Sequence, residues 1–169
     1  MDIRNSIKIV LLNQSNQLLL IGIDDKNITE SSGKYNGKFW QLIGGKIEEN
    51  ETLEQAMQRE LFEETSLTEK EVTFGPIIWH GALDLIMHGV PTHITQKFIL
   101  AKTEAKSVGL SHLTAEEKSV VKELRWFSID EIENSDEIIY PALLPKYLRP
   151  ILDGNIPEKS IEIDLSSKK

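Results

Sequence analysis

Short aliphatic runs separated by polar turns dominate the first part of the chain. Residues 6–12 and 17–23 are rich in Ile, Val and Leu, and the polar segment 13–16 lies between them. This pattern is typical of a β-hairpin. Residues 24–38 are polar and include two glycines, so we expect a loop there.

The next apolar run leads into an amphipathic helix. Residues 39–43 are predicted to form a short strand that runs directly into the Gly44-Gly45 pair. We expect the helix to begin near Thr52, because Gln55 three residues later can complete a capping box. Helical spacing then places four apolar side chains on one face, namely Leu53, Ala56, Met57 and Leu61.

The second half of the chain mixes strands with short helices. Strands are predicted over residues 72–80, 83–87, 93–102 and 124–129, and the polar residues 102–117 indicate a loop. Interleaved strands and helices of this kind favour a mixed sheet between helices.

Towards the end of the chain the pattern becomes helical. A short helix is expected to start at Ser128 or Asp130 and to continue through Glu133. Residues 140–152 are apolar at helical spacing but contain three prolines, so we expect one or two short helices broken by them. Residues 1–154 are taken as a single domain, and residues 155–169 are expected to form a frayed tail.

Composition narrows the class of protein. A chain of 169 residues with 40% hydrophobic residues fits one ordinary globular domain. The net charge of −8 argues against a general nucleic-acid-binding surface. There is no cysteine, which excludes disulfides and thiolate catalysis. The apolar runs are too short to span a membrane and no secretory signal is evident, so a cytoplasmic protein is the default expectation.

The predicted amphipathic helix carries an unusual density of acid. Residues 48–64 contain seven carboxylates and one basic residue, Arg59. Glu60, Glu63 and Glu64 share one helical face, where like charges repel each other, and Glu60 and Glu64 border the apolar stripe. Taken alone, the three could form an exposed acidic face. A divalent cation would neutralise them, and carboxylate oxygens suit Mg²⁺ or Mn²⁺.

The segment 45–67 resembles the Nudix box, which is glycine, five residues, glutamate, seven residues, then Arg-Glu-apolar-x-Glu-Glu-x-Gly-apolar. Eight of the nine defining positions match. The segment 124–132, with the sequence LRWFSIDEI, also resembles a strand-to-helix segment common late in Nudix domains. The matching box positions are Gly45, Glu51, Arg59, Glu60, Leu61, Glu63, Glu64 and Leu67.

Similarity to the MutT-like Nudix hydrolases implies an α/β/α sandwich with a mixed central sheet. Two positions depart from the family pattern. Ser66 replaces the glycine just past the helix, where a left-handed backbone would cost a non-glycine residue about 1–2 kcal/mol. Ile43 stands where many members have proline, which affects the stiffness of the loop more than the chemistry.

The resemblance also implies a metal site. Glu60 and Glu64 correspond to direct ligands of Mg²⁺, or of Mn²⁺ in its place, and the carbonyl of Gly44 to a further ligand. Glu63 corresponds to a ligand or to the general base. These four residues are the predicted metal-binding set.

Three other residues complete the predicted catalytic set with Glu60 and Glu63. By resemblance, Arg59 and Glu51 pair to hold the glycine loop against the helix. Family members often recruit one more carboxylate from outside the box, and Glu117 is preferred here over its acidic neighbours Glu116 and Glu123.

The implied reaction is hydrolysis of a diphosphate linkage, in a nucleoside diphosphate joined to another group, by metal-activated water. The implied partner is a small nucleotide, and a homodimer is compatible with the family. A Nudix-fold sensor that binds a nucleotide without cleaving it remains the alternative, although sensors commonly lose box carboxylates that this chain keeps. No substrate subgroup marker is found near Ala82, and the missing cysteine disfavours the isopentenyl diphosphate isomerase branch.

Overall fold

The structure is a computed structural model that describes residues 1–26, 28–30 and 37–166. Its strands are β1 (Asp2–Leu12), β2 (Leu18–Asp24), β3 (Ile28–Glu30), β4 (Lys38–Lys46), β5 (Val72–Met87), β6 (Val90–Thr103), β7 (Val121–Phe127) and β8 (Ile161–Glu162). Its helices are α1 (Leu53–Thr65), the 3₁₀ turn η1 (Glu69–Glu71), α2 (Ala115–Val120), α3 (Ile129–Glu133) and α4 (Leu144–Leu152).

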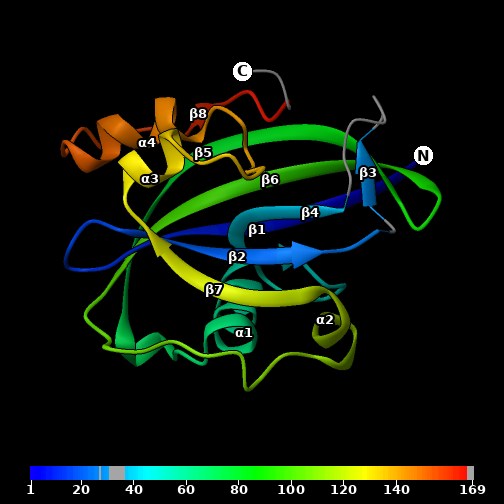
Figure 1. The fold of residues 1–169 in the computed structure, drawn as a ribbon, viewed down its shortest axis with the longest axis horizontal. Coiled ribbons are helices and arrows are strands. Elements are labelled where there is room, and N and C mark those ends of the chain that lie inside the picture. Colours follow the sequence, from blue (N-terminus) through cyan, green and yellow to red (C-terminus); the bar gives the residue numbers. More distant parts are fainter. Residues whose placement is uncertain (27, 31–36, 167–169) are drawn as a thin grey trace.

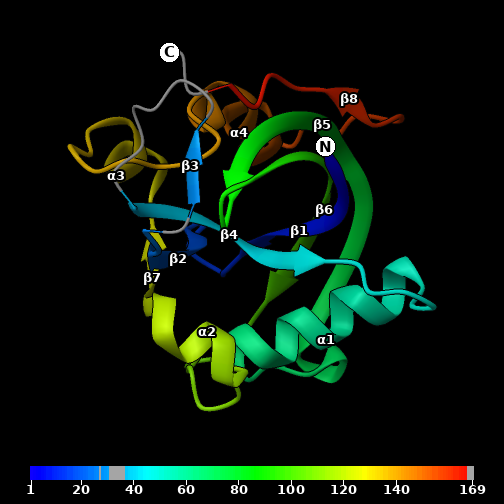
Figure 2. The ribbon, with the colours of Figure 1, turned by 90° about the vertical axis from the view of Figure 1, so that its right-hand side faces the viewer.

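A mixed sheet forms the middle layer of the fold. The strands follow the order β3-β5-β6-β1-β4-β2-β7, and β8 pairs with β5. Strand β1 runs parallel to β6 and antiparallel to β4. Helices α1 and α2 lie on one side of the sheet, whereas α3 and α4 lie on the other (Figures 1 and 2). The predicted α/β/α sandwich with a mixed sheet is therefore confirmed.

Strand β4 bends sharply in its middle, and this bend corrects the predicted hairpin. Its first half pairs antiparallel with β2, through Leu20 and Leu42 among others, and its second half pairs antiparallel with β1, through Ile9 and Ile43. Figure 1 shows the resulting curve between the two neighbours. Strands β1 and β2 consequently pair with each other only at Leu12 and Leu18, so the expected hairpin exists at its turn but not along its length.

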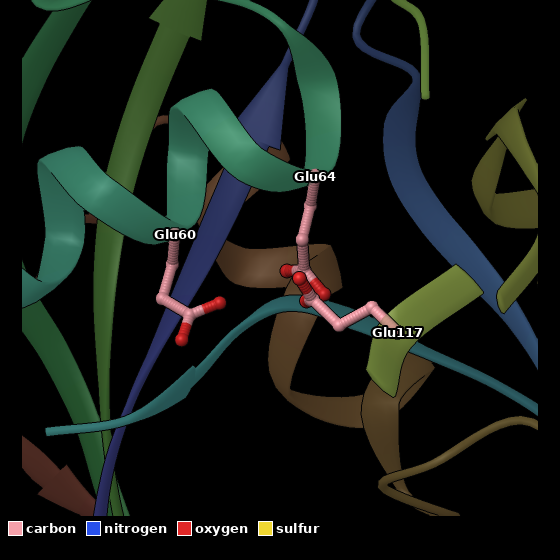
Figure 3. Close-up of side chains that lie close together, drawn as sticks. All are labelled: Glu60, Glu64 and Glu117. Carbon is pink, nitrogen blue, oxygen red and sulfur yellow. The ribbon is translucent and has the colours of Figure 1, made fainter. Parts of the chain in front are cut away.

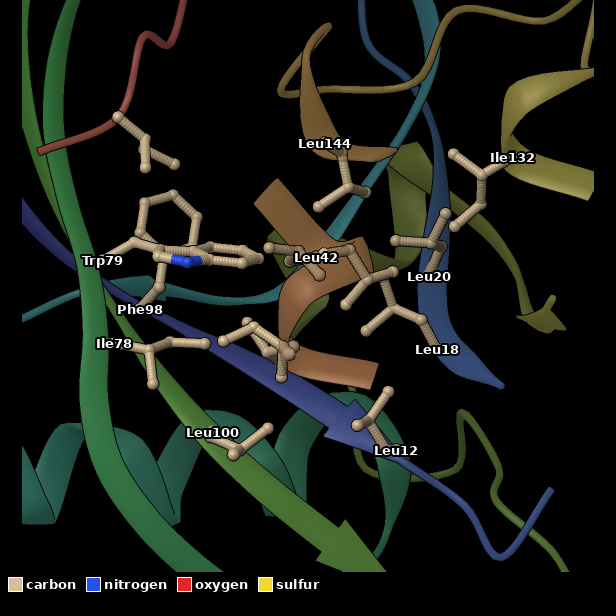
Figure 4. Packing of buried hydrophobic residues seen from close by; sticks show 14 of the residues in the cluster. Leu12, Leu18, Leu20, Leu42, Ile78, Trp79, Phe98, Leu100, Ile132 and Leu144 are labelled. Carbon is tan, nitrogen blue, oxygen red and sulfur yellow. The ribbon is translucent and has the colours of Figure 1, made fainter. Parts of the chain in front are cut away.

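Two apolar clusters hold the layers together. One fills the space between the sheet and α1, and the other packs the opposite face against α4 (Figure 4). In the second cluster Trp79 contacts Phe98 with ring centroids 5.6 Å apart. Because the α1 cluster reaches the carboxyl end of the helix through Leu61 and Leu67, α1 is held rigidly along its length.

Several element boundaries differ from the predicted ones. The two strands expected over residues 72–80 and 83–87 are one strand, β5, with register shifts between Phe74 and Trp79. The expected loop over residues 102–117 ends in helix α2. Helix α4 is continuous with Pro150 inside it, because a proline in the last turn removes only one hydrogen bond. Of the expected loop over residues 24–38, positions 27 and 31–36 lie outside the described residues.

The segment after α4 packs against the sheet where a frayed tail was expected. Ile161 and Glu162 pair with Trp79 and His80 of β5. Ile163 and Leu165 are each only 4% exposed and belong to the α4 cluster. The polar composition of this segment favoured a frayed tail, but burial of these two apolar side chains stabilises its packing on the sheet. Residues 167–169 lie outside the described part of the chain.

Candidate active site

Helix α1 begins and packs as its sequence predicts. Thr52 caps the helix, its hydroxyl accepts from the N–H of Gln55, and the Gln55 side chain accepts from the N–H of Thr52, which completes the capping box. The apolar stripe packs against the sheet, and Glu60 and Glu64, which lie at its edge, face the sheet as well. These two side chains are therefore buried, with residue exposures of 6% and 4%.

A third carboxylate approaches from a different element. Glu117 lies on α2, and carboxylate oxygens of Glu60, Glu64 and Glu117 all lie within 4.8 Å of one another. Figure 3 shows the three side chains directed towards the same space. Glu116 and Glu123 are not in this group, so of the three acidic neighbours considered, the structure brings Glu117 to the helix.

Backbone geometry fixes the position of Glu64. The N–H of Gly44 donates to Glu64 Oε1 over 2.6 Å. Gly44 has φ +129°, and a Cβ atom there would lie 2.1 Å from the carbonyl oxygen of Ile7, so only glycine fits. At the next residue the constraint falls on a side chain instead, because a Cβ on Gly45 would lie 2.6 Å from Glu60 Oε1 and would displace that carboxylate.

Burial disfavours the ionised forms of Glu60, Glu63 and Glu64 and so raises their pKa values. It raises the pKa of Glu60 to about 7, although the nearby Arg59 guanidinium opposes the shift. Burial and the charge of Glu60 raise the pKa of Glu64 well above its ordinary value, and Lys8 and the Gly44 N–H act in the opposite direction. Burial also raises the pKa of Glu63, again against Arg59.

Arg59 links the helix to the glycine loop. Its Nε and Nη2 atoms donate to the two oxygens of Glu51 over 2.7 and 2.9 Å, and Nη2 also donates to the carbonyl of Lys46 over 2.9 Å. Nη1 donates to Glu60 over 2.9 Å and lies 3.3 Å from Glu63. This bidentate geometry is the pairing expected for Arg59 and Glu51, and it lowers the pKa of Glu51.

Glu63 is placed differently from its two neighbours. It lines the same cleft, but it does not belong to the converging group of three carboxylates. Its charged partner is Arg59. The structure therefore separates Glu63 from Glu60 and Glu64, which the sequence had grouped as one metal-binding face.

Ser66 adopts the left-handed conformation that its position predicts, with φ 66°. Its hydroxyl donates to the carbonyl of Gly109 over 3.0 Å and lies 2.9 Å from His112 Nδ1. The N–H of Gly109 in turn donates to the carbonyl of Thr65. These contacts fasten the segment between β6 and α2 to the end of α1.

The carboxylates lie in a cleft of about 500 Å³. Several residues that line it did not appear in the sequence analysis. Lys8 is buried beside Glu64, and its Nζ lies 3.4 Å from the carbonyl of Leu42. Its position as a single lysine within the aliphatic run IKIVLL was a usable signal, because charged residues are rarely buried without a role. The other unpredicted polar lining residues include Arg4, Ser6, Gln41 and Gln96.

The residues present fit a hard divalent cation. Three carboxylates that converge in a cleft repel one another when all are ionised, and burial, which is the main cause of the raised pKa values of Glu60 and Glu64, adds to the cost of their charge. Oxygen donors of this type match Mg²⁺ or Mn²⁺. Gly44 pairs with Lys8 across the sheet, and the role of its carbonyl as a ligand stays a prediction.

Fold and site together define an α/β enzyme with an acidic active-site helix. The NUDIX domain model matches residues 2–147, which is most of the chain. The chain therefore belongs to the Nudix hydrolase family, as the box predicted. Among the described helices, none has both the length and the apolar character needed to cross a membrane.

Similar proteins carry several activities in their names. An 8-oxo-dGTP diphosphatase of Proteus vulgaris is 43% identical over 72 residues, which are 42% of this chain and 56% of that protein. An RNA pyrophosphohydrolase of Histophilus somni is 26% identical over 92% of this chain and 81% of that protein.

Solved structures agree on the fold. A MutT protein from Methanosarcina mazei matches with a TM-score of 0.64 and 20% identity, over 94% of this chain and 97% of that one. An Ap4A hydrolase from C. elegans matches with a TM-score of 0.60 and 22% identity, over 89% and 98% of the two chains.

Proposed function

We propose that this protein is a divalent-metal-dependent pyrophosphohydrolase that cleaves a diphosphate linkage in a nucleotide. The observation that carries the proposal is the convergence of Glu60, Glu64 and Glu117, from two helices, within one cleft. The names of the similar proteins support the same type of bond, since each describes cleavage of a nucleotide or RNA phosphoanhydride.

In this proposal Glu60, Glu64 and Glu117 hold Mg²⁺ or Mn²⁺. The cation would screen the phosphate oxygens and lower the pKa of the attacking water. Glu63 then serves as the proton acceptor, because it lines the cleft outside the converging group and burial moves its pKa upwards, towards the range of an efficient general base. Arg59 and Glu51 keep the glycine loop in place.

The test is phosphate release from a panel of nucleoside triphosphates, nucleotide sugars, dinucleoside polyphosphates and triphosphorylated RNA. Each substrate is assayed with Mg²⁺, with Mn²⁺ and with EDTA. Glu64→Gln should lower the rate at least ~100-fold, the scale on which catalytic groups contribute. Glu54→Gln, an exposed carboxylate on the same helix, is the matched control and should retain activity.

Wild-type turnover in Glu64→Gln would contradict the role of Glu64. Tight nucleotide binding with no turnover under any of these conditions would instead support the sensor alternative. EDTA-resistant hydrolysis would contradict the metal dependence.

A further inference from the structure

The cleft changes character across the sheet, away from α1. Strands pair so that Gly81 of β5, Gln96 of β6 and Ser6 of β1 stand side by side. The adjacent row consists of Leu83, Ile94 and Arg4. Paired residues face the same side of a sheet, and all of these residues except Gly81 line the cleft.

Charge decreases in the same direction. The carboxylates lie on α1 and α2, and the cations Lys8 and Arg4 lie on β1. Gln96 lies one strand further on, roughly 5 Å across the sheet, and the apolar residues of β5 lie beyond it. A ligand that fits this gradient is anionic at one end and uncharged at the other.

The uncharged end is an apolar wall with one polar group. We call Leu83, Leu85, Ile94, Gln96 and Leu165 the β5–β6 wall. Leu83 and Leu85 alternate along β5 and remain half-exposed in the cleft, so a ligand could still bury apolar surface there. Leu165 reaches the wall from the C-terminal segment and fills the space over Gly81, where a Cβ atom would lie 2.8 Å from Leu165 Cγ.

The Gln96 side chain is uncommitted. Within the described part of the chain it makes no hydrogen bond, although it is half-buried. A carboxamide presents one donor and one acceptor side by side, which matches the N6 amino group and N7 of adenine. The opposite side of the cleft also offers a glutamine, Gln41, but there Phe39 and Tyr140 already pack edge to face, with ring centroids 5.6 Å apart.

We propose that the β5–β6 wall binds the base of the nucleotide substrate and that Gln96 is the specificity-determining residue, selecting adenine. This inference rests on the proposed function for its choice of ligand. The base packs against Leu83 and Leu165, and the phosphates point towards α1.

The test compares ATP, GTP, 7-deaza-ATP and purine riboside triphosphate by kcat/KM. 7-Deaza-ATP lacks the N7 acceptor, and purine riboside triphosphate lacks the amino donor. Wild type should prefer ATP over both by at least ~5-fold, because a bidentate pair discriminates by about 1–3 kcal/mol. Gln96→Leu should abolish that preference, mainly through KM, and Gln14→Leu, an exposed glutamine in the β1–β2 turn, should not.

Gln41→Leu decides between the two sides of the cleft. If the preference disappears in Gln41→Leu and persists in Gln96→Leu, the inference is wrong, as it is if wild type prefers another base. Thermal unfolding of each variant verifies that the fold is intact.

Calorimetric binding of analogues in which methylene groups replace both the α,β and the β,γ bridging oxygens repeats the comparison without turnover. Adenine binding that depends on Gln96, with no hydrolysis of any nucleotide, would support the inference and contradict the proposed function. Hydrolysis with an unchanged base preference in Gln96→Leu would support the proposed function and contradict the inference.

Discussion

At the residue scale, the ionisation of Glu60 should make the stability of the folded protein depend on pH. An acid whose pKa is higher in the folded protein than in the unfolded chain destabilises the fold as pH rises, because the folded state then binds more protons. For Glu60 the pKa rises from 4.5 to about 7, so the metal-free protein should lose stability across this window. Above it the penalty is complete.

Glu60→Gln removes this penalty. In EDTA its melting temperature should increase relative to wild type as the pH rises from about 5 to about 8, after any constant offset from the lost contact with Arg59. Thermal unfolding across this range measures the difference. Parallel profiles for the two proteins would show that Glu60 ionises normally.

Lys8 should matter to stability chiefly through Glu64. In Lys8→Met the buried carboxylate of Glu64 loses a nearby cation that lowers its pKa, so the metal-free protein should be less stable at pH values where Glu64 ionises. Urea unfolding of metal-free protein at about pH 8 should show this loss. The double variant Lys8→Met/Glu64→Gln should recover most of it, whereas additive losses would mean that the two side chains do not interact.

At the scale of the elements, Ser66 at the end of α1 has two opposing effects on stability. Its left-handed backbone is strained, and its hydroxyl forms a hydrogen bond to Gly109, which we call the Ser66 tether. Ser66→Ala keeps the left-handed backbone but removes the bond to Gly109, so it should destabilise the protein by about 1 kcal/mol. Ser66→Gly also loses the bond but relieves about 1–2 kcal/mol of strain, so it should be at least as stable as wild type.

Amide exchange distinguishes the two effects. In both variants the N–H of Gly109, which bonds to Thr65, should exchange faster than in wild type. Unchanged protection would show that the backbone contact alone holds the segment.

The C-terminal segment should be sensitive to a single methyl group. In Gly81→Ala the added Cβ would lie 2.8 Å from Leu165 Cγ and 2.9 Å from the carbonyl oxygen of Ile163. The segment must then move, at a cost of about 1–3 kcal/mol. Hydrogen exchange over residues 161–165 should accelerate. Gly109→Ala is the control, because Gly109 has no positive φ and no atom lies within 4 Å of its Cβ position, and it should leave this exchange unchanged.

What the sequence predicts depends on how local the cause is. The capping box at Thr52 and the left-handed Ser66 follow from neighbouring residues, and both are confirmed. Lys8 and Gln96 reach the cleft through the parallel pairing of β1 with β6, and the bend in β4 rearranges the expected hairpin. Such long-range pairings leave no periodic signal in the chain, so Gln96 could not be assigned from the sequence. For Lys8 the lone charge within an aliphatic run was a usable signal, but it did not show which cleft the side chain would enter.

At the scale of the whole molecule, cation binding and folding should be linked. The three converging carboxylates approach one another only in the folded chain, so a bound cation stabilises the native state. Saturating Mg²⁺ or Mn²⁺, at 100 times the dissociation constant, should add about 2.7 kcal/mol. The gain should increase with pH, because protons on Glu60 and Glu64 compete with the cation.

Calorimetric scans with and without cation measure this linkage. Glu117→Gln should reduce the gain, whereas Glu116→Gln, its exposed neighbour, should leave it unchanged. Equal gains in the two variants would remove Glu117 from the cation site.

The Ser66 tether also affects how often the carboxylate group is complete. Glu117 belongs to a helix that follows an irregular segment, and a long free segment would dilute its carboxylate over a large volume. Anchoring that segment at Gly109 shortens the part that remains free, which increases the effective concentration of Glu117 beside Glu60 and Glu64. Cation affinity should therefore depend little on loop ordering and mainly on charge.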